Sequence, residues 1–198
     1  MKRYLQITAL LLLPVLAGCG TSVKRVDTAE VIDISGKWND TDSRLTAEEM
    51  MSDCTTRPWI SEATAAAGAK PSVIVGTVRN LSSEHINSNV FVEDLQRALI
   101  NSGRVTFVAS KDERGQVRDE RLDQATNASE ETRKAHGQEM GADFMLSGDI
   151  NTIEDKEGGK VAILYQVNLK LLNMKTNQIV WNGEKKIKKL VKRSSSSW

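Results

Sequence analysis

Cysteine and histidine are scarce in this sequence, which has two of each among 198 residues. It has no CxxC or HExxH pattern, and neither histidine has a carboxylate or a cysteine at the spacing of a zinc site. A glycine-rich phosphate loop and the GxSxG motif of serine hydrolases are also missing. These absences remove the common sequence signatures of catalysis, so we predict a protein that is not an enzyme and binds no cofactor or metal.

Long hydrophobic runs are missing as well. The most apolar stretch, residues 5–16, is shorter than the roughly 20 residues that a membrane-spanning helix needs. It follows the cationic residues Lys2 and Arg3 and ends in small residues, which is typical of an export signal. We therefore expect this segment to be removed from the mature protein.

The cysteine at the end of this stretch has a chemical explanation. Residues 16–19, LAGC, match the bacterial lipobox, in which small residues fit the signal peptidase and the cysteine thiol accepts a diacylglycerol. The alternative is a buried thiol at the end of an apolar helix, which would have to stop at Gly18 and restart among polar residues. We predict a signal peptide over residues 1–18 and lipidation of Cys19.

Two further expectations follow from lipidation. A thioether at Cys19 cannot form a disulfide, so Cys54 is expected to be a lone thiol packed on a helix. Gly20 replaces the Asp that commonly retains a lipoprotein in the inner membrane. For a Gram-negative cell we therefore predict an anchor in the outer membrane, on its periplasmic face.

The rest of the chain has the composition of one soluble globular domain, with 39% hydrophobic and 27% charged residues. We place a lipidated N-terminus and short tether at residues 19–33, the globular domain at 34–193 and a disordered tail at 194–198. The last 48 residues are basic, with ten Lys or Arg against four Asp or Glu. An exported protein meets little nucleic acid, so we expect the partner of this region to be an anionic lipid, polymer or protein surface.

Hydrophobic periodicity and turn residues predict the secondary structure. The expected elements of the first half, in chain order, are a helix capped by Thr41 or Ser43, a connection over 56–71, a strand at 73–78, and a helix at 88–102 with Phe91, Leu95, Ala98 and Leu99 on its buried face. They are followed by a strand at 104–110, a solvated helix or extended arm at 111–126, a helix from Asn127 to Gly141, a strand at 143–153, and a hairpin over 161–189 that turns at 174–177. Its return strand is expected to direct Ile179, Trp181 and Ile187 inward. This order predicts an α/β (α+β) fold, a mixed β-sheet flanked by helices and closed by a C-terminal β-hairpin.

The remaining polar residues do not form a convincing site. His85 and His136 are expected to be solvent-exposed and structural. Residues 39–43, NDTDS, superficially resemble a calcium loop but lack the glycine at the sixth position and the distant glutamate, so Asp40, Thr41 and Ser43 are interpreted as helix-capping residues.

Several motifs in a fixed order resemble one known family. They are SGKWNDTDSRL, TRPW, SVIVGTVRN, LQRALINSGRVTFV, GADFMLSGDI and YQVNLKLLNMKTNQIVWNGEKKIKK, which together span about residues 35–189. Behind a lipobox, this set resembles the LpoB-like outer-membrane lipoproteins, also called penicillin-binding protein activators. The resemblance implies a periplasmic domain similar to the N-terminal domain of TolB that docks on a bifunctional penicillin-binding protein and stimulates peptidoglycan synthesis. It implies no catalytic activity, no small-molecule substrate and no nucleic acid.

One feature departs from the family. Its best-known member has a long, proline-rich tether, whereas residues 20–33 here extend at most about 50 Å at roughly 3.3 to 3.6 Å per residue. Three explanations stay open: the domain itself spans the gap, the envelope differs, or the partner differs. A noncatalytic scaffold of an envelope complex, TolB-like or curli-secretion-like, is the alternative function.

Overall fold

The computed structural model describes residues 21–131 and 139–192, and the chain divides into two units, residues 1–30 and 31–198. In the first unit the described residues are irregular apart from a turn in which the Glu30 amide donates to the Asp27 carbonyl at 3.1 Å. The second unit contains all the helices and strands assigned in the described residues. The predictions for residues 1–20 and for the 194–198 tail lie outside the described residues.

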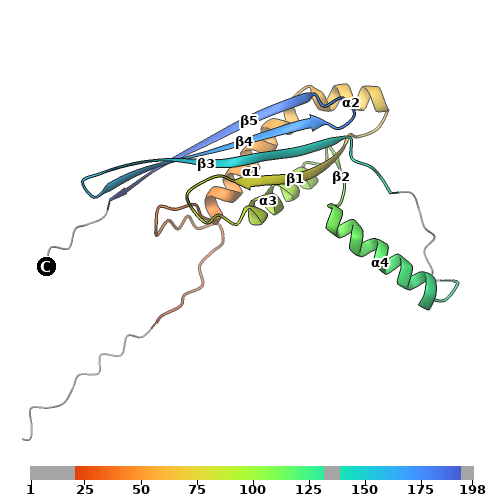
Figure 1. The fold of residues 1–198 in the computed structure, drawn as a ribbon, viewed down its shortest axis with the longest axis horizontal. Helices are drawn as coiled ribbons and strands as arrows, with labels where there is room; N and C mark the ends of the chain where they lie inside the picture. Colours follow the sequence, from red (N-terminus) through yellow and green to blue (C-terminus); the bar gives the residue numbers. More distant parts are fainter. Residues whose placement is uncertain (1–20, 132–138, 193–198) are drawn as a thin grey trace, which may run out of the picture. The chain divides into compact units, whose positions relative to one another are not determined.

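A five-stranded mixed sheet organises the second unit (Figure 1). Its strands are β1 (Ser72–Asn80), β2 (Thr106–Phe107), β3 (Phe144–Glu157), β4 (Lys160–Asn173) and β5 (Ile179–Lys192), arranged in the order β2-β1-β3-β4-β5. β1 is parallel to β2 and β3, whereas β3, β4 and β5 are antiparallel. The predicted mixed sheet and its closing C-terminal hairpin are therefore confirmed.

Two helices cover one face of the sheet. They are α1 (Asp40–Thr56), which packs on β5, and α3 (Ser88–Ser102), which packs on β1 and on α1. The predicted face of α3 is confirmed, because Phe91, Leu95 and Leu99 are buried in the core, Ala98 packs against it, and Gly103 ends the helix in a left-handed conformation. On the sheet, five alternate side chains of β4 are buried: Ile163, Tyr165, Val167, Leu169 and Leu171.

The opposite face of the sheet, called here the open face, carries the alternate side chains. On β4 these include Lys170, and on β3 they include Ile153, which is 66% exposed. The centre of the open face is polar, because Asn168 donates to Asp149 at 2.9 Å and Gln166 donates to Asn168 at 3.0 Å. Strand geometry alone produces this division, since successive side chains of a strand point to opposite faces.

The start of α1 differs from the prediction. Asn39, rather than Thr41 or Ser43, is the N-cap, and it forms a capping box with Asp42 in which each side chain accepts the other residue's amide at 3.0 Å. Thr41 and Ser43 are buried against the rest of the domain, and Asp40 begins the helix. A capping box satisfies two unpaired amides at once, which explains why it sets the boundary.

The connection predicted over residues 56–71 contains a helix, α2 (Trp59–Ala67). Its run of alanines favours a helix on propensity alone, and Gly68 ends it at φ 68°. Trp59 anchors α2 in the core, because it is 4% exposed and its Nε1 donates to the Cys54 carbonyl at 2.7 Å.

Three other boundaries also differ. The strand expected at 104–110 is reduced to Thr106–Phe107, because it pairs only with the first residues of β1 at the sheet edge. Asn127 ends α4 (Lys111–Asn127) instead of starting a helix, and residues 132–138 of that predicted helix lie outside the described residues. Ile179 is 54% exposed because the register of β5 shifts opposite Leu171 and Leu172, which returns Trp181 to the core but not Ile179.

Candidate functional site

The entry of the chain into the domain is fixed by one lysine of β5. Lys189 Nζ lies 2.6 Å from Asp42 Oδ2 and 2.8 Å from Asp33 Oδ2, and it donates to the Lys37 carbonyl at 2.9 Å. Only 11% of the Lys189 side chain is exposed. The hydrogen bond from Lys189 holds the pKa of the Asp33 carboxyl below its usual value. These contacts, called here the entry clamp, attach residues 33–42 to the end of β5.

Aromatic packing completes this attachment. Trp38 lies against Tyr165 with ring centroids 5.5 Å apart and against Phe91 at 6.1 Å. Glu84 accepts a hydrogen bond from the Tyr165 hydroxyl at 2.7 Å and another from the Trp38 amide at 3.1 Å. Burial and the neighbouring Glu84 both raise the pKa of Tyr165, so the phenol stays a hydrogen-bond donor.

We expect Lys189→Met to destabilise the domain by about 2 kcal/mol at pH 7, because Asp42 would stay largely buried without its cation. The control is Lys185→Met, whose partner Glu49 is 62% exposed and should cost under about 1 kcal/mol. Asp33 has a depressed pKa in the folded state, so its contribution exists above its unfolded pKa of about 3.9 and disappears as the pH falls through the folded value. Urea denaturation from pH 7 to pH 3 should show the difference from wild type narrowing below about pH 4; a constant difference would contradict this role for Asp33.

The basic residues near the end of the chain divide between the two faces of β5. Lys185 and Lys189 point inward to the acidic residues of α1 and its N-terminal approach. Lys186, Lys188 and Lys192 lie on the open face, and we call them, with Leu190 between them, the lysine column. Lys186 pairs with Glu184 at 2.9 Å, whereas no ion pair joins Lys188 or Lys192 to any residue of the described part of the chain. Arg193 lies outside the described residues.

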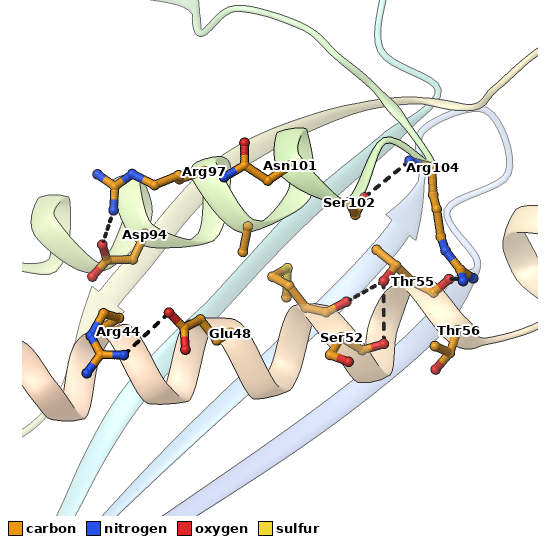
Figure 2. Close-up of a pocket in the computed structure, with 12 residues that line it drawn as sticks. Arg44, Glu48, Ser52, Thr55, Thr56, Asp94, Arg97, Asn101, Ser102 and Arg104 are labelled. Carbon is orange, nitrogen blue, oxygen red and sulfur yellow. Dashed lines mark hydrogen bonds and ion pairs between the residues drawn. The ribbon is translucent and has the colours of Figure 1, made fainter. Parts of the chain in front are cut away.

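A groove of about 530 Å³ lies between α1 and α3 (Figure 2). Two of its lining cations are paired with acids: Arg97 lies 2.8 Å from Asp94, and Arg44 lies 3.5 Å from Glu48. The third, Arg104, has a neutral partner, since its Nη1 donates to the Thr55 carbonyl at 2.9 Å. The groove therefore has little free charge to offer a ligand.

Helix α4 stands apart from the core. It begins with a capping box between Ser110 and Glu113, and none of its residues is buried. Val117 and Leu122 are 46% and 60% exposed, and Arg118 makes two hydrogen bonds of 2.6 Å with Glu139. The prediction of a solvated helix at 111–126 is confirmed, and its apolar side chains are available to a partner.

The other candidate residues are placed as follows. Cys54 is a free thiol packed on α1, as predicted, and it is fully buried. Burial raises the pKa of this thiol to about 12, so it has little nucleophilic character. His85 is exposed in the loop between β1 and α3, while Cys19 and His136 lie outside the described residues. Within residues 21–131 and 139–192, no cluster of side chains suits a metal ion, and no helix has the length and apolarity needed to cross a bilayer.

The inward and outward lysines of β5 were not distinguished from the sequence alone. The alternation of side chains along a strand would have distinguished them. Lys185 and Lys189 lie an even number of residues from the buried Trp181 and so share its face, whereas Lys186, Lys188 and Lys192 lie an odd number away. The acidic partners of Lys189 are over 140 residues away in sequence, and only the fold brings them together.

Several known proteins are similar to this chain. The model of a family described as "Peptidoglycan-synthase activator LpoB" matches residues 42–187. Among solved structures, the LpoB C-terminal domain from Salmonella enterica is 21% identical, with 66% of this chain and 93% of that chain covered and a TM-score of 0.34. The corresponding domain from Escherichia coli is 20% identical, with coverages of 74% and 98% and a TM-score of 0.34. The NMR structure of Escherichia coli LpoB is 17% identical, with coverages of 91% and 85% and a TM-score of 0.37. No curated protein sequence matches the chain.

Proposed function

Because the chain belongs to the LpoB family of peptidoglycan-synthase activators, we propose that it binds a bifunctional penicillin-binding protein and stimulates its peptidoglycan synthesis. The observation that carries this proposal is the extent of the family match. Residues 42–187 run from the first turn of α1 into β5, so the match includes both helices that cover the sheet and nearly the whole sheet. The proposed function is therefore supported by a match over most of the folded domain rather than by one motif.

The proposal includes a location and an anchor. The lipobox supports lipidation of Cys19, and Gly20 supports sorting to the outer membrane, where the domain would face the periplasm. The protein would act without chemistry of its own. An activator of this kind must bind the active form of the synthase more tightly than the inactive form, and a tenfold stimulation requires a difference of about 1.4 kcal/mol between them.

Helix α4 is the surface that we assign to the synthase. It extends into solvent with no buried residue, and it combines charges of both signs with the exposed apolar side chains Val117 and Leu122. Such a helix gains buried apolar area only when a second molecule covers it. The capping box at Ser110 keeps it helical in the absence of a partner.

We expect Val117→Asp with Leu122→Asp to lower synthase stimulation at least tenfold while leaving the unfolding midpoint unchanged, since neither side chain belongs to the core. The assay is glycan-chain synthesis by each bifunctional penicillin-binding protein of the same cell, with a direct binding measurement. Leu81→Asp is the matched control, because Leu81 is 55% exposed in the loop after β1 and should tolerate the charge.

The outcomes of this assay test the α4 contact and the proposed function independently. Full stimulation by the double variant would reject α4 as the contact. If the wild-type domain neither binds nor stimulates any of these synthases, the proposed function fails, and crosslinking to scaffold or secretion proteins would then favour the envelope-scaffold alternative.

A further inference from the structure

We infer that the lysine column of β5 is a docking surface for an anionic phospholipid bilayer, which holds the domain against the membrane that anchors it. The inference rests on the proposed anchor at Cys19 for its direction, but it does not depend on any synthase. Three features of the described residues support it: the free charges, the apolar side chains between them and the place where the chain enters the domain.

Two of the three ammonium groups of the column have no partner in the described part of the chain. Lys188 and Lys192 are exposed on the open face, and neither side chain forms a hydrogen bond or an ion pair with another described residue. Lys160, at the end of β4, is also exposed and stands in register beside Lys192. Lysines on an edge strand can also serve to prevent edge-to-edge pairing between sheets. That role does not explain the exposed apolar side chains beside them.

Apolar side chains lie between these lysines. Leu190 is 63% exposed between Lys188 and Lys192, and across the sheet Ile153 stands in register with Leu164, which is next to Lys188. Ammonium groups that alternate with aliphatic side chains fit the boundary of a bilayer, where the former meet phosphates and the latter enter the acyl region.

Acidic groups share this part of the open face, and they set its orientation. Asp155 and Glu157 lie on β3, two strands from β5 and therefore about 10 Å away. A bilayer would repel them, so the domain should approach it with the β5 edge leading. Glu184, at the other end of the column, is neutralised by Lys186.

The entry clamp ties the chain to the other face of the strand that carries the column. Asp33 binds Lys189, and the side chain of Val191 occupies the space where a Cβ on Gly36 would lie. The chain therefore enters the domain beside the strand residues that alternate with the column. Residues 19–32 reach at most about 50 Å when fully extended, so a lipid at Cys19 would keep the column close to the membrane.

The test uses the chain from residue 19 carrying Cys19→Ala, which removes the lipid and leaves the surface. Co-sedimentation is measured with vesicles of equal phosphatidylglycerol and phosphatidylethanolamine and with vesicles of phosphatidylcholine. The test variant is Lys188→Glu with Lys192→Glu. The control is Lys170→Glu with Lys175→Glu, which changes the net charge equally near the β4–β5 turn, at the other end of the hairpin.

We expect binding to the anionic vesicles that weakens as salt increases, and little binding to phosphatidylcholine. The test variant should bind at least about 30-fold more weakly, because the lost attraction of two lysines at an anionic surface corresponds to about 2 kcal/mol and the new carboxylates add repulsion. The control should stay within about threefold of the parent chain. Equal losses in the two variants, equal binding to both kinds of vesicle, or no binding at all would overturn the inference. So would unchanged vesicle binding with lost synthase stimulation, which would assign the column to a protein partner instead.

Discussion

Replacing Cys19 with alanine is expected to move the protein from the membrane fraction of cells to the soluble fraction. The three acyl chains of a mature lipoprotein supply nearly all of the attachment, since each buried methylene contributes about 0.8 kcal/mol and one chain therefore contributes on the order of 10 kcal/mol. The lysine column alone binds weakly and in a salt-dependent way. After a wash at high salt, we expect almost all wild-type protein and almost none of the Cys19→Ala variant in the membrane fraction.

Cys54→Ala is the matched control, because it removes the other cysteine of the chain. Cys54 is fully buried on α1, so this change should cost about 1 kcal/mol of stability and leave membrane attachment intact. The mass of the mature protein gives an independent measurement, since processing adds a diacylglycerol and a third acyl chain to residue 19 and removes residues 1–18. Retention of Cys19→Ala after the high-salt wash would reject the lipid anchor, whatever the synthase assays give.

The second large effect concerns the core. Phe91→Ala should destabilise the domain by about 3 to 5 kcal/mol, because it leaves a cavity where α3 meets the sheet and Trp38. Phe91 is completely buried, and its ring makes an edge contact with Trp38 at 6.1 Å. A loss of this size is a large part of the stability of a typical domain.

Val90→Ala changes the neighbouring residue of the same helix and is the control. Val90 is 50% exposed, so its truncation should change the free energy of unfolding by less than about 0.5 kcal/mol. Urea denaturation followed by circular dichroism measures both variants. Equal midpoints for the two would mean that α3 does not pack on the sheet through Phe91.

The fold was predictable where local patterns and burial agree. Phe91, Leu95 and Leu99 recur at helical spacing, and the residues from Tyr165 to Leu171 alternate between apolar and polar, so the sequence identifies both the helix and the strand together with their buried faces. The errors occurred where partners decide the boundary. Asn39 caps α1 through Asp42, and the register shift that exposes Ile179 depends on the pairing of β4 with β5.

The sequence by itself determined the lipobox match at Cys19, the order of the strands and the excess of lysines near the end of the chain, because each of these depends on residue types within short segments. Only the tertiary structure decided what the lysines do. It brings Asp33 and Asp42 to Lys189 and leaves Lys188 and Lys192 in solvent. The physical reason is that a strand turns neighbouring side chains to opposite faces, and long-range packing then decides which face receives a helix and which receives water.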